Sequence, residues 1–377
     1  MSRPRPNPRL SLISIAVALA LSACGGGGSA AVPVTSTSAA SSPSAAAAEL
    51  NVAATPNPNV FPLLVALAQN PALPVKLVAT ATSGDAASAL TGGSADALLS
   101  MTYTASQDVA NGSVPDLELV SVNFWSGFWM VAPASITTFS QLAGQGVLVS
   151  GPTSGGKGSG PDLIFQAAAR RAGFGASSFQ LCYLPVMQAA PMLLQQQAMN
   201  TNNACAGAET MPPAAISLVE PAATGLVMDS MTNPGPSGPL TKAINFQSLF
   251  TGYTQWPASQ LPHGGMSVRA VALADPSRLA ATRAVLAAYR AAVDSIMAAK
   301  GNPGASARIA STISAGITTY YGQFGLSLPA PAIAAALNAG TLVFRSDLSI
   351  DATQPDLTAF LTEVVGSAPP ASFFHPL

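Results

Sequence analysis

Charged side chains are scarce in this chain. Asp, Glu, Lys and Arg make up 8% of its 377 residues, against roughly a quarter in an average soluble domain. The 15 Lys and Arg residues form no basic patch of the kind that binds nucleic acid. The composition therefore excludes a nucleic-acid partner.

Catalytic and metal-binding motifs are also missing. The only histidines are His263, in a Pro/Gly loop, and His375, near the C-terminal end, and no Gly-x-Ser-x-Gly or His/Cys cluster with metal-ligand spacing occurs. Gly151–Lys157 copies most of a P-loop, but Gly158 stands where a Mg²⁺-binding Ser or Thr is required. Ser154-x-x-Lys157 matches the acylating motif of penicillin-recognising enzymes without their partner motifs. We therefore expect no enzyme, no cofactor and no metal.

One long apolar run is present, at Leu10–Leu21. It is too short to span a bilayer, which takes about 20 residues, but it follows three arginines, as in a secretory signal peptide. It ends in Leu21–Cys24 (LSAC), which resembles the lipobox of bacterial lipoproteins, whose Cys is acylated and becomes the first mature residue. We expect residues 1–23 to be a signal peptide and lipid on Cys24 to anchor the exported protein to the outer face of the cell membrane or in the periplasm. The alternative is an ordinary cleavable signal, in which Cys24 is incidental.

The next segment, residues 24–48, has no charge and no aromatic side chain, so it cannot bury enough apolar surface to fold. We expect a disordered tether. About 330 residues remain, enough for one large core or two lobes. Without the leader arginines the net charge is about −4, and since no second apolar run approaches membrane-spanning length, we expect a soluble body.

Two cysteines remain after Cys24, at Cys182 and Cys205. An exported compartment is oxidising, and two cysteines allow a single intramolecular pairing. Such a bond would stabilise the fold by about 3 kcal/mol in the chain-entropy account. The alternative is two free buried thiols.

From Glu49 onward, short apolar strands alternate with helical stretches, the pattern of an α/β protein. Asn57 or Asn59 is a candidate cap for a helix at 60–69, Pro161 suits the start of another helix, and Asp275 suits the cap of a long helix to about Ala299. The strands are predicted at 50–54, 75–79, 95–101, 117–122, 128–132, 146–150, 179–184, 214–219 and 266–273.

The ordered set of segments from about residue 49 to 365 resembles the solute-binding proteins of nitrate/sulfonate/taurine-type ABC importers. The resemblance is carried by Asn51–Gln69, Phe128–Ala132 (FWMVA) with Phe139–Val149 (FSQLAGQGVLV), Pro161–Phe165 (PDLIF) with Arg170–Phe174 (RRAGF), and Ala214–Pro221 (AAISLVEP). The family's usual Asp and two Lys are replaced in the second segment by Gln141 and uncharged neighbours.

This resemblance implies the α/β, type II periplasmic-binding-protein fold, in which two lobes joined by two hinge strands enclose a small-molecule solute. Lobe 1 would comprise residues 49–131 and 263–377, and lobe 2 residues 132–262, with hinges near Phe128–Pro133 and Pro262–Val268. The implied partners are an ABC permease and its ATPase, and we expect this chain to be a monomer. The implied solute is a small organic or anionic compound of the sulfonate, nitrate or taurine class.

Ligands of open α/β sheets bind beyond the carboxyl ends of parallel strands, where helix N-termini offer free N–H groups. A Gly/Ser loop with one lysine suits an anion there, and a solvent-exposed turn is the alternative. Tyr103 and Trp125 would stack on a solute or belong to the core. Glu220 would accept hydrogen bonds from a solute or brace the hinge with Arg269. The candidate ligand-binding residues are Asn57, Asn59, Thr102, Tyr103, Asn123, Trp125, Ser154, Gly155, Lys157, Ser159 and Glu220.

Two other functions stay open from the sequence. One is a ligand-presenting partner of a sensor, and the other is an enzyme on the same fold. Loss of permease-dependent uptake on deletion would indicate transport, whereas turnover of the solute by the purified protein would indicate catalysis.

Overall fold

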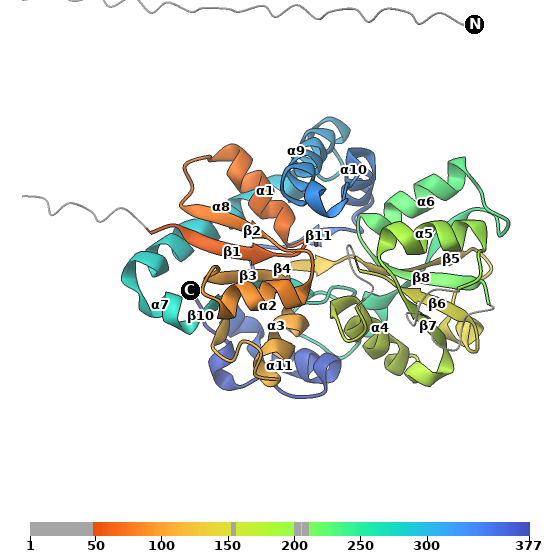
Figure 1. Ribbon diagram of the computed structural model, residues 1–377, viewed down its shortest axis with the longest axis horizontal. Helices are drawn as coiled ribbons and strands as arrows, with labels where there is room; N and C mark the ends of the chain where they lie inside the picture. The colour runs from red at the N-terminus through yellow and green to blue at the C-terminus, as the bar shows by residue number, and fades with distance from the viewer. Residues whose placement is uncertain (1–47, 152–155, 200–204, 206–210) are drawn as a thin grey trace, which may run out of the picture. The chain divides into compact units, whose positions relative to one another are not determined.

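The computed structural model describes residues 48–151, 156–199, 205 and 211–377. Residues 45–377 group into one unit, which contains two mixed β-sheets, as Figure 1 shows. The predicted signal peptide, Cys24 and nearly all of the predicted tether lie outside the described residues. Among the described residues, no helix combines the length and the apolar character needed to cross a membrane.

The first sheet has six strands in the order β11-β4-β10-β3-β1-β2. β1 pairs in parallel with β2 and β3, whereas β10 runs antiparallel to β3 and β4. The strands are β1 (Leu50–Ala54), β2 (Val75–Ala79), β3 (Ala97–Met101), β4 (Leu117–Ser126), β10 (Gly264–Arg269) and β11 (Val343–Phe344).

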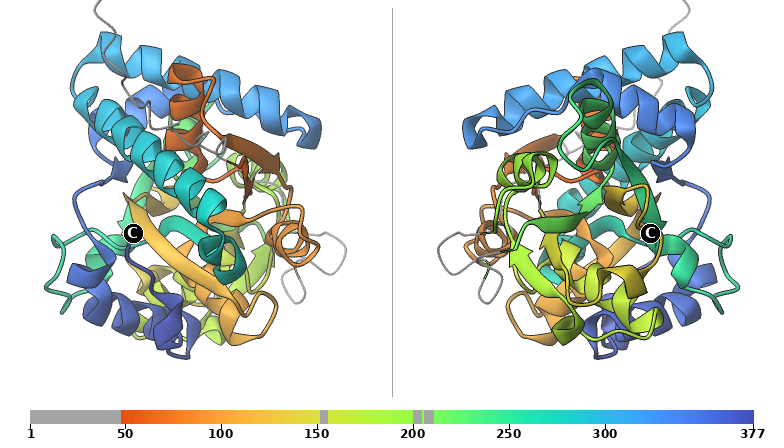
Figure 2. Two further views of the ribbon diagram at one scale, coloured as in Figure 1. Left: turned by 90° about the vertical axis from the view of Figure 1, so that its left-hand side faces the viewer. Right: turned by 90° about the vertical axis from the view of Figure 1, so that its right-hand side faces the viewer.

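Helices cover both faces of this sheet. On one face α1 packs against α8 and α9, and Figure 2 shows these three helices together on one side. On the other face α2, α3 and α11 contact the strands. The helices are α1 (Val60–Gln69), α2 (Ser83–Thr91), α3 (Thr102–Ala110), α8 (Pro276–Ala298), α9 (Pro303–Tyr321), α10 (Ala330–Ala339) and α11 (Ile350–Val365). We call this sheet with these helices the first half.

The second sheet has five strands in the order β7-β6-β8-β5-β9, with β6 parallel to β7 and β8 and with β5 antiparallel to β8 and β9. We call it, with α4, α5 and α6, the second half. Its elements are β5 (Phe128–Pro133), β6 (Gly146–Val149), α4 (Gly160–Arg171), β7 (Gln180–Tyr183), α5 (Val186–Gln195), β8 (Pro213–Val219), α6 (Ala222–Thr232) and β9 (Leu240–Asn245).

The chain passes from the first sheet to the second within one residue, since β4 ends at Ser126 and β5 begins at Phe128. It returns between β9 and β10. The segment predicted as the first hinge, Phe128–Pro133, lies entirely in the second sheet, and most of the second, from Gly264 on, lies in the first sheet. The predicted lobe boundaries stay predictions.

The two halves contact each other on both sides of this crossing. α4 packs against α3 and α11, and α6 packs against α10. One apolar core runs through the first sheet, the crossing and the inner face of α4, and a smaller core lies between the second sheet and α5 and α6. The disulfide between Cys182 and Cys205 belongs to that smaller core.

The mixed α/β class is confirmed, as are β1, α1 and β2 at their predicted bounds. Asp275 caps α8 by accepting from the N–H groups of Ser277 and Arg278, as predicted. The cap predicted for α1 is wrong. Asn59 occupies that position without a side-chain cap bond, because its amide reaches instead to the Ser100 carbonyl, 2.9 Å away.

Candidate functional site

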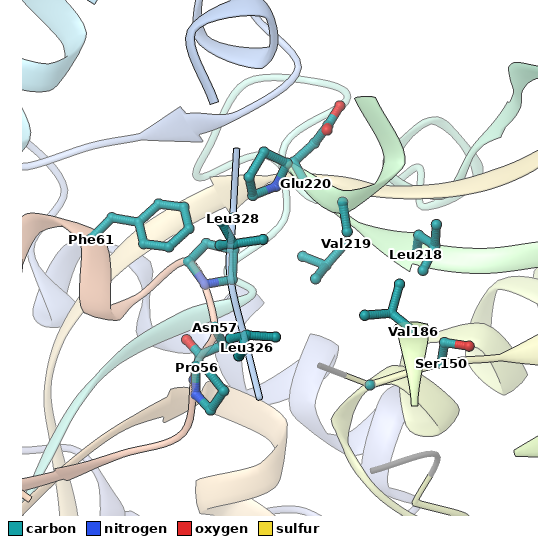
Figure 3. Close-up of a pocket in the computed structure, with 14 residues that line it drawn as sticks. Pro56, Asn57, Phe61, Ser150, Val186, Leu218, Val219, Glu220, Leu326 and Leu328 are labelled. Carbon is teal, nitrogen blue, oxygen red and sulfur yellow. The ribbon is translucent and has the colours of Figure 1, made fainter. Parts of the chain in front are cut away.

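Three adjoining cavities lie along the contact between the two halves, and we call them together the seam. The central cavity is lined by Asn57 and Phe61 of the first half, by Val186 and Val219 of the second, and by Leu328 from the segment between α9 and α10, among others (Figure 3). Its volume is about 30 Å³, enough for a few water molecules but far below the roughly 300 Å³ of a small-molecule site.

The other two cavities continue the central one in opposite directions. The inner cavity, about 50 Å³, shares Asn57, Gly151 and Val219 with it. The outer groove, about 400 Å³, shares Val186, Leu328 and three further residues with it and continues along α5, α6 and the start of α10. Of these three cavities, the outer groove has the size of a small-molecule site.

The seam lies where strand ends from both sheets meet. β1 and β3 of the first sheet and β6 and β8 of the second all direct their carboxyl ends toward it, since residues directly after each strand or at its end line the cavities. The lining residues at these ends are Thr55, Ser100, Ser150 and Glu220. This is the position that open α/β sheets use for ligands.

Asn57 lines both the inner and the central cavity and is buried. Its amide nitrogen donates to the Thr55 hydroxyl (2.9 Å) and to the Thr55 carbonyl (3.1 Å), and its amide oxygen accepts from the Asn59 N–H (2.8 Å). Asn57 therefore shapes the turn after β1 with polar atoms that are already partnered. Asn59 is fully buried beneath it and lines none of the three cavities.

Thr102 and Tyr103 are buried at the start of α3, outside the lining of the seam. The Thr102 hydroxyl donates to the Pro262 carbonyl. The Tyr103 ring packs edge-on against Phe360 and His263, with centroids 6.2 and 6.3 Å away, and burial raises the pKa of its phenol well above the usual value. Both side chains belong to the core. For Tyr103, core packing is one of the two roles that the sequence allows.

Asn123 and Trp125 are likewise buried at the end of β4. The Asn123 amide donates to the Arg345 carbonyl (3.1 Å), and the Trp125 indole N–H donates to the Val122 carbonyl (3.2 Å). The Trp125 ring packs against Trp256 with centroids 5.6 Å apart. These residues join the crossing to the first half and do not line the seam.

The Gly/Ser loop before α4 is described in part. Ser154 and Gly155 lie outside the described residues. Ser159 lines the inner cavity and donates its hydroxyl to the Gly156 carbonyl. Lys157 is exposed and lines none of the three cavities.

Glu220 follows β8 and is fully buried, but Arg269 does not pair with it. One Glu220 oxygen accepts from the Lys242 ammonium (2.5 Å) and the other from the Thr224 N–H (3.1 Å). The predicted brace between Glu220 and Arg269 is wrong because β10 runs antiparallel to β3, so Arg269 at its carboxyl end lies at the end of the sheet far from the carboxyl ends of β1 and β3. There Arg269 lies beside the start of β4 and pairs with Asp116 at 3.0 Å.

The sequence places His263 in a Pro/Gly loop and gives no sign that its side chain is buried. The ring is fully buried, with both nitrogens unpartnered, between Phe128 and Phe124 at centroid distances of 4.8 and 5.6 Å. Burial lowers the pKa of the imidazole to about 3, because the charged form would lose its hydration. His263 is therefore a neutral core residue at the return of the chain to the first sheet.

Sequence reasoning missed the apolar lining of the seam. Phe61, Val186, Leu218, Leu326 and Leu328 surround the central cavity, yet each reads in the sequence as an ordinary core or loop residue. Leu326 and Leu328 come from a segment more than 100 residues beyond β8. Among the described residues, no group of three His, Cys, Asp or Glu side chains is placed to hold a metal ion.

No protein-family model matches this chain, and no curated protein matches it in sequence. Solved structures do match its fold. The periplasmic aliphatic sulphonate-binding protein of Escherichia coli superposes with a TM-score of 0.56 at 15% identity, over 84% of this chain and 85% of that one. The alkanesulfonate-binding protein of Xanthomonas axonopodis pv. citri, bound to MOPS, gives 0.55 at 15% identity, over 88% and 99%.

Two further structures extend the comparison. The ligand-binding component of an ABC-type import system from Staphylococcus aureus gives a TM-score of 0.58 at 11% identity, over 87% of this chain and 97% of that one. A Candida albicans protein described as having the generic periplasmic-binding-protein fold gives 0.55 at 15% identity, over 87% and 96%. The chain therefore has the periplasmic-binding-protein fold.

Proposed function

We propose that this chain is the extracytoplasmic solute-binding component of an ABC importer, which captures a small solute in the seam and delivers it to a permease. The observation that carries the proposal is the meeting of strand carboxyl ends from both sheets at one line of cavities. Solved structures of the same fold, at low identity, are sulphonate-binding and import proteins, which supports a transport role over catalysis.

Capture requires the two halves to move apart and close again. The covalent links between the sheets support this, since the first is the single residue Gly127 between β4 and β5 and the second is the stretch before β10. The central cavity is too small for an organic solute in the closed arrangement, so a solute would enter when the halves separate. Closing would then remove it from water along strand ends of both sheets.

Export and anchoring belong to the same proposal. A lipid on Cys24, followed by the segment 25–48, would hold the folded unit near its permease while leaving it free to turn. The predicted ligand contacts of the Gly/Ser loop, Ser154, Gly155 and Lys157, are part of the proposal as well. Unchanged affinity for the identified solute in Lys157→Ala would remove that loop from the site.

Native mass spectrometry of gently purified protein tests the capture of a solute. We expect a bound small molecule that is lost on unfolding, and we expect deletion of the gene to abolish uptake of that molecule. Chemical conversion of the molecule by the purified protein would point to an enzyme instead. Binding without an uptake defect would point to a sensor's ligand-presenting partner.

A further inference from the structure

A further cavity lies outside the seam, beside the edge strands β11 and β9 of the two sheets. Its volume is about 500 Å³, which is within the range of small-molecule sites. Phe344 of β11, Asn245 at the end of β9 and residues 258–260 before β10 contribute to its lining. Among the described residues, none lines both this cavity and the seam. We call it the edge cavity.

Both halves of the molecule line the edge cavity. Trp129 of β5 belongs to the second half, whereas Lys300 after α8 and Arg345 after β11 belong to the first half. The Trp129 ring, Met297 and Val343 add apolar surface beside the polar groups. A molecule bound in the edge cavity would therefore contact both halves, with one wall suited to an apolar group and the other to a polar one.

The charged side chains of this lining are cationic. Lys300 and Arg345 are present, and none of the described lining residues is Asp or Glu. The Arg345 guanidinium is paired with the Asp347 carboxylate through two hydrogen bonds of 2.9 and 2.6 Å. Lys300, which is exposed at the rim, forms no ion pair with a described carboxylate. Its ammonium is thus available to an anion.

Two helix ends also reach the edge cavity, and a helix C-terminus carries a partial negative charge on its unpartnered carbonyls. α8 ends beside Met297 and Lys300, and α10 ends beside Gly340. The Met297 carbonyl accepts from the Lys300 N–H at 3.2 Å, and the Leu337 carbonyl accepts from the Gly340 N–H at 3.0 Å. Because carbonyls at both ends already have partners, the helix ends oppose an anion less than two free ends would.

The uncharged amides of the lining offer donors rather than acceptors. The Asn245 amide oxygen already accepts from the Gln247 N–H at 3.0 Å, and the Gln260 amide oxygen accepts from the Arg345 guanidinium at 3.2 Å. The amide nitrogens of Asn245 and Gln260 donate to no other described residue. A ligand that satisfies these groups must supply acceptor atoms, and hydrogen bonds to a charged acceptor are the stronger ones.

We propose that the edge cavity is a second ligand site, which takes a small organic anion whose charge lies on oxygen atoms, such as a carboxylate or a sulfonate. Its oxygens accept hydrogen bonds from the Lys300 ammonium and from the Asn245 and Gln260 amides. Its apolar part lies against the Trp129 ring and Met297. The site is separate from the seam and does not depend on the function proposed for the seam.

Titration with benzoate, and with its uncharged analogue benzamide, tests the site on the full folded protein. The three tryptophans of the chain give three indole N–H signals in two-dimensional ¹H–¹⁵N NMR spectra, and Trp129→Phe identifies the signal of Trp129. We expect benzoate to shift this signal to saturation. We expect benzoate to bind at least about tenfold more tightly than benzamide, a difference of about 1.4 kcal/mol.

Two charge variants separate this site from other places where benzoate binds. Lys300→Met removes the unpaired cation from an exposed position, so we expect the fold to be kept. It should weaken benzoate at Trp129 at least about tenfold, again about 1.4 kcal/mol, and leave benzamide unchanged. Lys76→Met is the control, because Lys76 is exposed on the edge strand β2 and lines neither the edge cavity nor the seam. It should change neither affinity.

Three results overturn the proposal. They are a Trp129 signal that benzoate does not shift, benzoate that binds no more tightly than benzamide, and equal benzoate affinity in Lys300→Met and Lys76→Met. None of them bears on the function proposed for the seam. That function falls separately, if no solute co-purifies with the protein and deletion of the gene leaves uptake intact.

Discussion

Removal of the Lys242 ammonium should destabilise this protein far more than removal of a surface charge. Lys242 Nζ lies 2.5 Å from a Glu220 oxygen, 2.7 Å from the Thr224 hydroxyl and 2.9 Å from the Thr341 hydroxyl. Glu220 is fully buried, and Thr341 precedes β11 in the first half. The ammonium therefore both balances a buried carboxylate and links the second sheet to the first half.

The magnitude follows from what Lys242→Met leaves behind. Glu220 would keep one hydrogen bond, from the Thr224 N–H, and its charge would be buried without a partner. Such a loss costs about 3–5 kcal/mol of unfolding free energy, whereas replacing both members of a buried pair by neutral groups is often close to neutral. The double variant Glu220→Gln/Lys242→Met should therefore be more stable than Lys242→Met alone.

Urea unfolding at pH 7, followed by circular dichroism, measures the four members of this cycle. Lys76→Met is the matched control, because Lys76 is exposed on the edge strand β2. We expect the control to change the free energy of unfolding by less than about 0.5 kcal/mol, as surface substitutions usually do. If Lys242→Met costs no more than Lys76→Met, the pair does not carry the stability assigned to it.

Two further predictions concern the crossing between the sheets. Gly127→Ala should destabilise the fold by about 1–3 kcal/mol through overpacking, because a β-carbon there would lie 2.5 Å from the Phe124 ring. Gly322→Ala is the control, since Gly322 has open space around it. Equal urea midpoints for the two variants would contradict the argument. Burial lowers the pKa of His263 from 6.5 to about 3. As the pH is lowered, the imidazole is therefore protonated first in the unfolded state, and the free energy of unfolding falls between pH 6.5 and pH 3 by up to about 5 kcal/mol. His263→Leu should flatten this part of the pH dependence of the urea midpoint, and an unchanged slope would show that His263 does not cause it.

Much of the fold follows from local sequence signals. β1, α1 and β2 have short, strongly apolar patterns, and the Asp275 cap before Pro276 marks the start of α8. Elements with weak patterns were missed. α3 (Thr102–Ala110) is largely polar, and β9 (Leu240–Asn245, LTKAIN) follows a Pro/Gly-rich stretch without a regular alternation of apolar and polar residues. α3 packs against α11 and β9 pairs with β5, so these tertiary contacts determine the conformation of both segments.

The position of the candidate site follows from the sequence more readily than its lining does. The strand-end rule leads to Asn57, Ser159 and Glu220, and all three line the seam. The strand-end rule does not decide which side chains at the end of a strand face the seam. The sequence therefore gives Trp125 and Tyr103 as candidate ligand contacts, although both are core residues. The contribution of Leu326 and Leu328 depends on how the first half folds back over α5 and α6, which no local pattern reveals.

Closure of the two halves around a solute is the central claim, and a distance across the seam tests it most directly. Nitroxide labels at Met187→Cys on α5 and Ser327→Cys between α9 and α10, both on the outer groove, are placed in a Cys24→Ser background and measured by double electron–electron resonance. With the co-purified solute bound, we predict one narrow distance distribution. After its removal, we predict a broader distribution that extends to longer distances. Identical distributions with and without the solute would contradict the account.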